Sequence, residues 1–140
     1  MLKAVIDNET FFEVVKAELK SNKQVQFTVK GQSMWPFFHH NQTVVTVEQA
    51  KHFKKYDVVL FDYQGQVLLH RIIKIQTETI TLRGDSTFRK EVVPISSIFG
   101  KVIQHQNQKT TLTNNRSYRF KVWCWVHNPF RKLCIKARLR

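Results

Sequence analysis

The sequence contains few of the residues that would place it in several large classes of protein. Only two residues of 140 are cysteine, Cys124 and Cys134, so no disulfide framework can replace a hydrophobic core. No stretch approaches the roughly 18 consecutive apolar residues that a membrane-spanning helix requires. Residues 1–7 become acidic too soon for a secretory signal peptide. We therefore expect a protein of the reducing cytoplasm with two free thiols.

Acidic residues are also scarce, and their scarcity is uneven along the chain. The sequence has 23 Lys and Arg against 10 Asp and Glu, which gives a formal net charge of +13. Residues 116–140 contain eight basic side chains and no acidic one. The first 115 residues therefore hold 15 basic and 10 acidic side chains, a net charge of about +5. This contrast divides the chain into a domain at 1–115 and a basic, aromatic tail at 116–140.

The first part predicts one helix followed by a series of strands. Residues 7–21 place Phe11, Val15 and Leu19 at helical spacing, which is typical of a helix that packs on a sheet. From residue 22 to residue 112, short segments rich in β-branched residues are separated by turns. We expect a mainly β fold, coiled and antiparallel-rich. The predicted strands are 24–30, 43–48, 57–62, 66–76, 79–83, 98–105 and 109–112, with a hairpin turn at 63–66.

The tail predicts one or two short amphipathic helices, with a break near Asn128-Pro129. Two interpretations of this segment stay open. Its helices could cover the sheet with their cations in solvent, or they could lie peripherally on an anionic membrane surface, where Trp and Lys or Arg are favourable. Nucleic acid is a less favoured partner, because the segment has no recognised nucleic-acid motif. The apolar stripe consists of Phe120, Trp123, Val126, Phe130, Leu133 and Ala137.

A single serine follows the first predicted strand in a segment that favours a sharp turn. Gly31 permits such a turn, and Pro36 restricts the backbone. A serine on a turn of this kind is held in a fixed position, as a nucleophile must be. The alternative is that Ser33 only forms a hydrogen bond within the turn. The segment reads Gly31-Gln32-Ser33-Met34-Trp35-Pro36.

Two later segments contain the groups that could activate this serine. His70 lies inside the apolar strand at 67–73, and a neutral imidazole can accept a proton from a hydroxyl near neutral pH. Asp85 follows Gly84 at the end of another short strand, and Glu91 comes six residues after Asp85. An acid on the second ring nitrogen would fix the tautomer of the histidine. Both acids are candidates for that position.

Taken in order, these segments resemble the signal peptidase I superfamily of serine peptidases, which also contains the LexA-type self-cleaving repressors. The Ser33 segment resembles the Gly-x-Ser-Met-x-Pro box. His70-Arg71 resembles the form in the archaeal and endoplasmic-reticulum enzymes, and Gly84-Asp85 the third motif. Residues 55–61 resemble the family's Gly-Asp-Val-Val strand, with Tyr56 where Gly is usual. The resemblance covers about residues 22–105.

The resemblance implies a serine endopeptidase that cleaves a peptide or a leader-bearing precursor without a cofactor. It implies Ser33 as the nucleophile and its backbone N–H as an oxyanion donor, with His70 as the general base. Glu91 stands at the position of the orienting acid, and Asp85 is the alternative, which would otherwise support the loop. Gly31 lacks the hydroxyl that many relatives have two residues before the nucleophile. The residues implied for the substrate groove are Gln32, Met34, Trp35 and Pro36.

Two other functions remain open at this point. The chain could be a catalytically inactive module that keeps the fold, or a binding protein that acts through residues 116–140. We expect no metal site, because no pair of histidines has the spacing of a zinc helix or knuckle and no cysteine lies near enough to complete one. The sequence does not determine the oligomeric state or the identity of the substrate.

Overall fold

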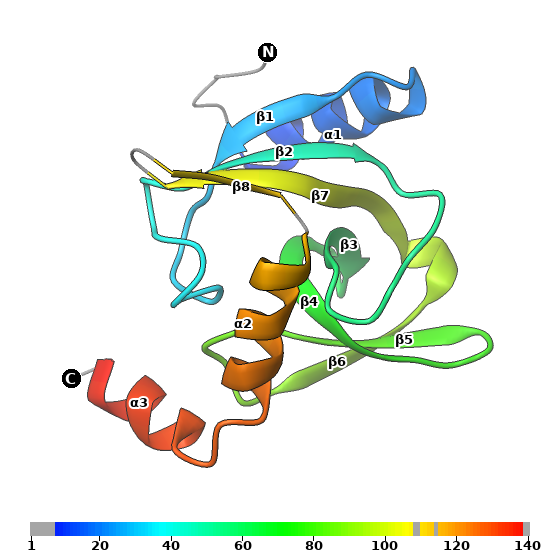
Figure 1. The fold of residues 1–140 in the computed structure, drawn as a ribbon. Helices are drawn as coiled ribbons and strands as arrows, with labels where there is room; N and C mark the ends of the chain where they lie inside the picture. Colours follow the sequence, from blue (N-terminus) through cyan, green and yellow to red (C-terminus); the bar gives the residue numbers. More distant parts are fainter. Residues whose placement is uncertain (1–7, 108–109, 114, 139–140) are drawn as a thin grey trace.

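The computed structural model describes residues 8–107, 110–113 and 115–138. These residues form one antiparallel sheet, with one helix before it in the chain and two after it (Figure 1). This is the mainly β fold that the sequence predicts. The elements are α1 (Asn8–Lys20), β1 (Val25–Thr28), β2 (Val44–Gln49), β3 (Val58–Tyr63), β4 (Gln66–Ile75), β5 (Thr79–Arg83), β6 (Lys90–Pro94), η1 (Ile95–Ser97), β7 (Ile98–Asn107), β8 (Thr110–Thr113), α2 (Arg116–Val126) and α3 (Arg131–Arg138).

The sheet has the strand order β1-β2-β7-β3-β4-β5-β6, and β8 also pairs with β7, which therefore has three partner strands. The β3–β4 hairpin pairs Tyr63 with Gln66, so the turn predicted at 63–66 is confirmed. Its two central residues, Gln64 and Gly65, have φ values of 50° and 78°. Two consecutive positive φ values are typical of the tight turns that join antiparallel strands.

The core beneath α1 follows from the periodicities of the helix and of β1. Val15 and Leu19 are buried on the inner face of α1, and Val25 and Phe27 alternate inward from β1. A Cβ atom on Gly100 of β7 would lie 3.1 Å from the Leu19 Cδ1 atom, closer than such contacts normally allow. The absence of a side chain at Gly100 therefore lets α1 approach the sheet closely. A second cluster of buried residues lies between β3, β4, β5 and β6.

Most of the predicted elements are shifted by one or two residues at their ends, and one strand of the structure is absent from the sequence-based expectation. The helix predicted at 7–21 is α1, and residue 7 lies outside the described residues, as does residue 109 of the last predicted strand. The strand β6 was not predicted. It pairs with β5, and its buried positions are Glu91 and Val93. A glutamate at an inward position and Pro94 at the end hide the alternation that normally indicates a strand.

The tail forms two helices, α2 and α3, separated near the predicted break. They cover part of the domain through the buried side chains Tyr118, Val122 and Ile135. Of the stripe predicted to be apolar, Phe120 and Trp123 are exposed. No helix in the described ranges is both long enough and apolar enough to cross a membrane. Residues 139–140 lie outside those ranges, and both cysteines are free.

Leu19→Ala should lower the free energy of unfolding by about 2–5 kcal/mol, because it leaves a cavity between α1 and β7. The leucine is 1% exposed. Urea denaturation followed by circular dichroism measures the change. The exposed substitution Glu13→Ala in the same helix is the control, and we expect it to stay within about 0.5 kcal/mol of the unsubstituted protein. Equal effects of the two substitutions would contradict this account of the core.

Candidate active site

A histidine and a glutamate from two strands form a buried pair. His70 lies on β4 and Glu91 on β6, with β5 between them. The His70 Nδ1 atom is 2.6 Å from Glu91 Oε1, and the side chains are 8% and 1% exposed. A carboxylate at this distance accepts the proton of Nδ1 and leaves Nε2 of a neutral imidazole as an acceptor. Glu91 Oε2 also accepts a hydrogen bond from Arg89 Nε at 3.4 Å.

The second nitrogen of His70 is open to an incoming group. Among the described residues, the buried side-chain atoms without a hydrogen-bond partner are His105 Nε2 and Arg131 Nε. His70 Nε2 forms no hydrogen bond with another described residue either, yet it is not among these enclosed atoms. We conclude that solvent, or the hydroxyl of a nucleophile, can reach it.

The turn that carries Ser33 is attached to the loop between β5 and β6. The Ser33 carbonyl accepts a hydrogen bond from Ser86 N at 2.9 Å, and the Gln32 carbonyl accepts one from Ser86 Oγ. A Cβ atom on Gly84 would lie 2.7 Å from the Ser33 carbonyl oxygen, so this approach requires glycine. Within the part of the chain that the structure describes, the Ser33 hydroxyl forms no hydrogen bond with His70. Such contacts are often long in unliganded enzymes.

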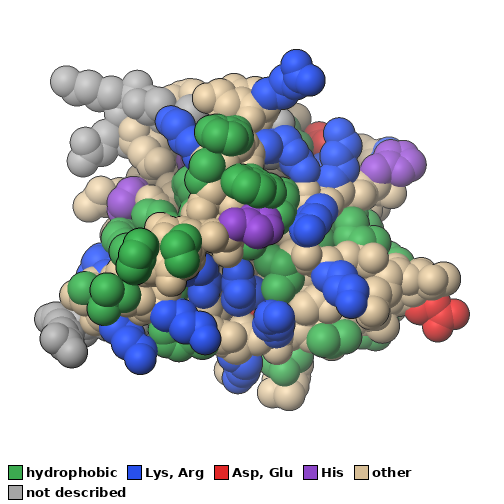
Figure 2. Space-filling model, turned by 60° about the horizontal axis from the view of Figure 1, so that its bottom comes forward, with side chains coloured by type: hydrophobic (Ala, Val, Ile, Leu, Met, Phe, Trp, Pro, Cys, Tyr) green, Lys and Arg blue, Asp and Glu red, His purple; other side chains and the backbone are tan. Residues whose placement is uncertain are grey.

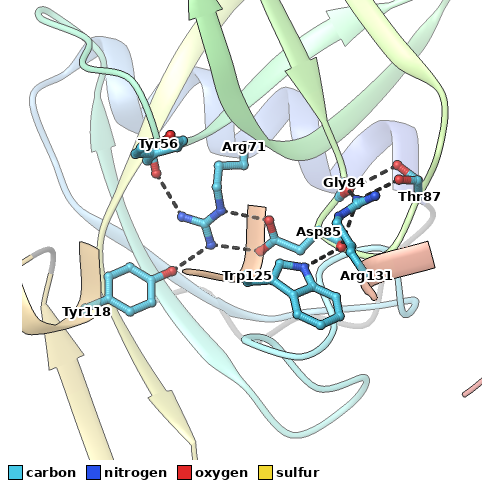
Figure 3. A network of polar contacts seen from close by, with 8 residues as sticks. All are labelled: Tyr56, Arg71, Gly84, Asp85, Thr87, Tyr118, Trp125 and Arg131. Carbon is cyan, nitrogen blue, oxygen red and sulfur yellow. Dashed lines mark hydrogen bonds and ion pairs between the residues drawn. The ribbon is translucent and has the colours of Figure 1, made fainter. Parts of the chain in front are cut away.

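The acid of the Gly-Asp segment does not contact the histidine. Asp85 binds Arg71 with both oxygens, at 2.8 Å from Nε and 2.8 Å from Nη2 (Figure 3). Arg71 also donates to the Tyr56 carbonyl at 2.8 Å and to the Tyr118 hydroxyl at 2.7 Å. Burial alone would lower the pKa of Arg71, but the charge of Asp85 and the contact with Tyr118 raise it above its ordinary value. The guanidinium is therefore a permanent buried cation.

Comparison with known proteins identifies the family of the chain. A family model described as Peptidase S24-like matches residues 3–103. The chain belongs to this family. The resemblance to the LexA and signal peptidase superfamily is thereby confirmed. A search of curated proteins finds no match.

The two C-terminal helices lie beyond the matched S24-like span but contact its Gly-Asp loop. Trp125 of α2 donates from Nε1 to the Asp85 carbonyl at 2.8 Å. Arg131 of α3 donates from Nη2 to the carbonyls of Gly84, Asp85 and Thr87, at 3.2, 3.0 and 2.7 Å (Figure 3). Sequence reasoning missed these contacts. Nothing in the spacing of a basic amphipathic segment indicates which of its cations becomes buried.

The residues expected in the substrate groove differ in their exposure. Met34 is 1% exposed and packs in the core beneath α1, so it supports the turn and cannot line a groove. Gln32 is exposed, and Trp35 and Pro36 are half-buried. The Trp35 ring meets the Trp125 ring edge-to-face, with centroids 5.7 Å apart. Helix α2 therefore extends the surface around the Ser33 turn.

A second histidine lies in the interior on the α2 side of the sheet. His105 of β7 is buried between the rings of Phe38 and Tyr118, with centroids 4.8 and 4.9 Å away. It lines a cavity of about 10 Å³, together with Arg71, which is space for about one water molecule. Burial and the Arg71 charge lower the pKa of His105 to about 4. Among the described residues, no cluster of three or more His, Cys, Asp or Glu could hold a metal ion.

Asp85→Asn should lower the free energy of unfolding by about 3–5 kcal/mol, because it leaves the buried Arg71 cation without a counter-ion. Urea denaturation measures the change. The matched control is Asp62→Asn, which removes a carboxylate that is 51% exposed and paired with Lys16. We expect that change to cost under about 1 kcal/mol. A cost for Asp85→Asn as small as the control would contradict a structural role for the ion pair.

The free energy of unfolding should also decrease as the pH is lowered from about 6.5 to about 4, because of His105. Its pKa is about 4 in the folded chain and about 6.5 when unfolded, so at these pH values only the unfolded chain binds the proton. The loss should approach roughly 3 kcal/mol at pH 4, at 1.36 kcal/mol per pKa unit. His105→Phe should flatten this part of the profile in urea titrations, while the exposed substitution His52→Gln should not. An unchanged slope in His105→Phe would assign the pH dependence to other groups.

Proposed function

We propose that the chain is a serine endopeptidase in which Ser33 is the nucleophile, His70 the general base and Glu91 the acid that orients the base. The observation that carries the proposal is the buried contact of 2.6 Å between His70 Nδ1 and Glu91 Oε1, which leaves Nε2 open. Membership of the Peptidase S24-like family supports a hydrolase of this general type.

The loop at residues 84–87 brings the Ser33 turn and the His70 strand to the same part of the sheet. It binds the turn through Ser86, and it binds Arg71, the neighbour of His70 on β4, through Asp85. Its connection to β6 leads to Glu91. One short loop therefore contacts or precedes each of the elements that carry the three proposed residues.

The proposed reaction is acyl transfer followed by hydrolysis. The Ser33 Oγ atom attacks the carbonyl carbon of the scissile peptide as its proton passes to His70 Nε2, and the Glu91 carboxylate stabilises the imidazolium. The imidazolium then protonates the leaving amine as the C–N bond breaks. Water, deprotonated by the same nitrogen, hydrolyses the ester on Ser33 and restores the hydroxyl.

The oxyanion donor would be the Ser33 backbone N–H. Within the described residues this N–H makes no hydrogen bond, so it is available for the developing charge. Gly31 provides no second hydroxyl donor, and its own N–H donates to His40 Nδ1 at 2.7 Å. The proposed substrate is an extended peptide or a leader-bearing precursor, bound along the turn beside the half-buried Trp35.

A second candidate is a module that keeps the S24-like fold without turnover. Two observations favour it: the Ser33 hydroxyl forms no hydrogen bond with His70 in the described chain, and Gly31 lacks the hydroxyl common among relatives. Such a module would keep its biological activity when the nucleophile is removed.

Ser33→Ala should abolish cleavage of a mixed peptide library, measured by mass spectrometry of the products. The exposed substitution Ser96→Ala is the matched control and should leave the rate unchanged. Glu91→Gln should lower kcat by about 100-fold or more, because the amide no longer stabilises the imidazolium. Cleavage that persists at the unsubstituted rate in Ser33→Ala would reject the proposed nucleophile. The second candidate would be favoured if the parent protein cleaves no peptide and its biological activity survives Ser33→Ala.

A further inference from the structure

Helices α2 and α3, with the turn between them, expose four large hydrophobic side chains that the proposed peptidase mechanism does not use. Each of the four is 49–66% exposed, although both helices are anchored to the domain by buried residues on their other side. We call this set the aromatic face: Phe120, Trp123, Phe130 and Leu133.

The aromatic face has an ordered geometry. The Phe120 and Trp123 rings are stacked with their centroids 6.5 Å apart, and Trp123 stacks on His127 at 4.5 Å. Behind them, Val122 and Ile135 are fully buried. Because the inward faces of α2 and α3 already hold the helices in place, the outward face is a preformed surface of the folded domain.

The charge around the aromatic face is of one sign. Between residues 115 and 138 the described chain contains no acidic side chain. Figure 2 turns this end of the molecule forward and shows hydrophobic side chains among many Lys and Arg side chains, with far fewer Asp and Glu. The exposed cations on the two helices are Arg116, Lys121, Lys132, Lys136 and Arg138.

We propose that the aromatic face docks on an anionic membrane surface, with its rings and Leu133 in the interface and its cations on lipid phosphates. Aromatic and leucine side chains beside Lys and Arg are the combination that an interfacial helix requires. Each cation near an anionic leaflet adds attraction that salt weakens. A protein partner is less well matched, because a surface without acidic groups would require a partner surface that is uniformly negative. Nucleic acid would not require an apolar contact at Leu133.

This proposal does not depend on catalysis by Ser33. Docking would also orient the domain on the membrane, since α3 carries Arg131, which binds the carbonyls of the loop at residues 84–87. Docking through the aromatic face therefore places that loop close to the lipid surface. A substrate presented there would be one that is itself at the membrane.

The test is flotation of the full chain with vesicles of phosphatidylcholine, with and without about one third phosphatidylglycerol. We expect binding to the anionic vesicles that weakens with salt, and little binding to the neutral ones. Phe130→Ser with Leu133→Ser should weaken binding by about tenfold or more, because two buried contacts with lipid are lost. The matched control is Ile75→Ser with Val92→Ser, two exposed apolar residues on β4 and β6, which should bind as the parent does.

Two further measurements separate this proposal from its competitors. Brominated lipids should quench the fluorescence of Trp123, and Trp123→Phe should remove that part of the quenching while binding persists. Ser33→Ala should bind vesicles as tightly as the parent, so that failure of the peptidase proposal would leave this one standing. Absent binding to anionic vesicles, equal loss in the Ile75 and Val92 control, or preferential binding to a DNA duplex would each overturn the proposal.

Discussion

The arrangement of the site depends on the hydrogen bonds and the ion pair formed by the Arg71 guanidinium. A buried charge is tolerated only when its partners satisfy it, so the positions of all of them become fixed together. Those partners come from three separate parts of the chain: Asp85 after β5, the Tyr56 carbonyl before β3, and the Tyr118 hydroxyl of α2. Since neighbouring residues of a strand point to opposite faces, His70 and Arg71 extend to opposite sides of β4. The sheet therefore separates the two acids, with Glu91 on the histidine and Asp85 on the arginine.

The backbone at Tyr56 shows how strongly this network constrains the chain. Its φ is 77°, in the left-handed region that favours glycine, and glycine is the usual residue in the motif that this segment resembles. A bulky side chain there costs roughly 1–2 kcal/mol. The conformation is held at both ends of the residue, because the Tyr56 N–H donates to the Ile72 carbonyl at 2.8 Å and its own carbonyl accepts from Arg71. These two backbone contacts hold the departure from the motif in place, and the Tyr56 side chain is buried against Tyr118 and Val122.

Much of this fold could be predicted from local patterns, and the exceptions have physical reasons. Alternation in β1 and the glycine of the 63–66 turn are properties of a few consecutive residues, so the sequence indicates them directly. The buried positions of β6 are not apparent, since a strand with an inward Glu91 reads as polar until His70 is placed against it. Helix α2 has apolar residues on two sides, and Tyr118 with Val122 is as regular a stripe as Phe120 with Trp123. Periodicity cannot say which stripe faces the domain; only the partner surface, with Arg71 in need of an acceptor, selects Tyr118.

The C-terminal helices complete the site although the family match ends at residue 103. Three carbonyls of the loop at residues 84–87 point toward Arg131. A single guanidinium nitrogen of Arg131 donates to all three. Burial lowers the pKa of Arg131 to about 10, still far above neutral pH, so the donor stays charged. The same loop binds the Ser33 turn through Ser86. A displacement of α3 would therefore reach the Ser33 turn through one loop. The outward Leu133 of the aromatic face and the inward Arg131 lie on this same short helix. The position of the proposed active site is thus coupled to the surface on which α3 rests.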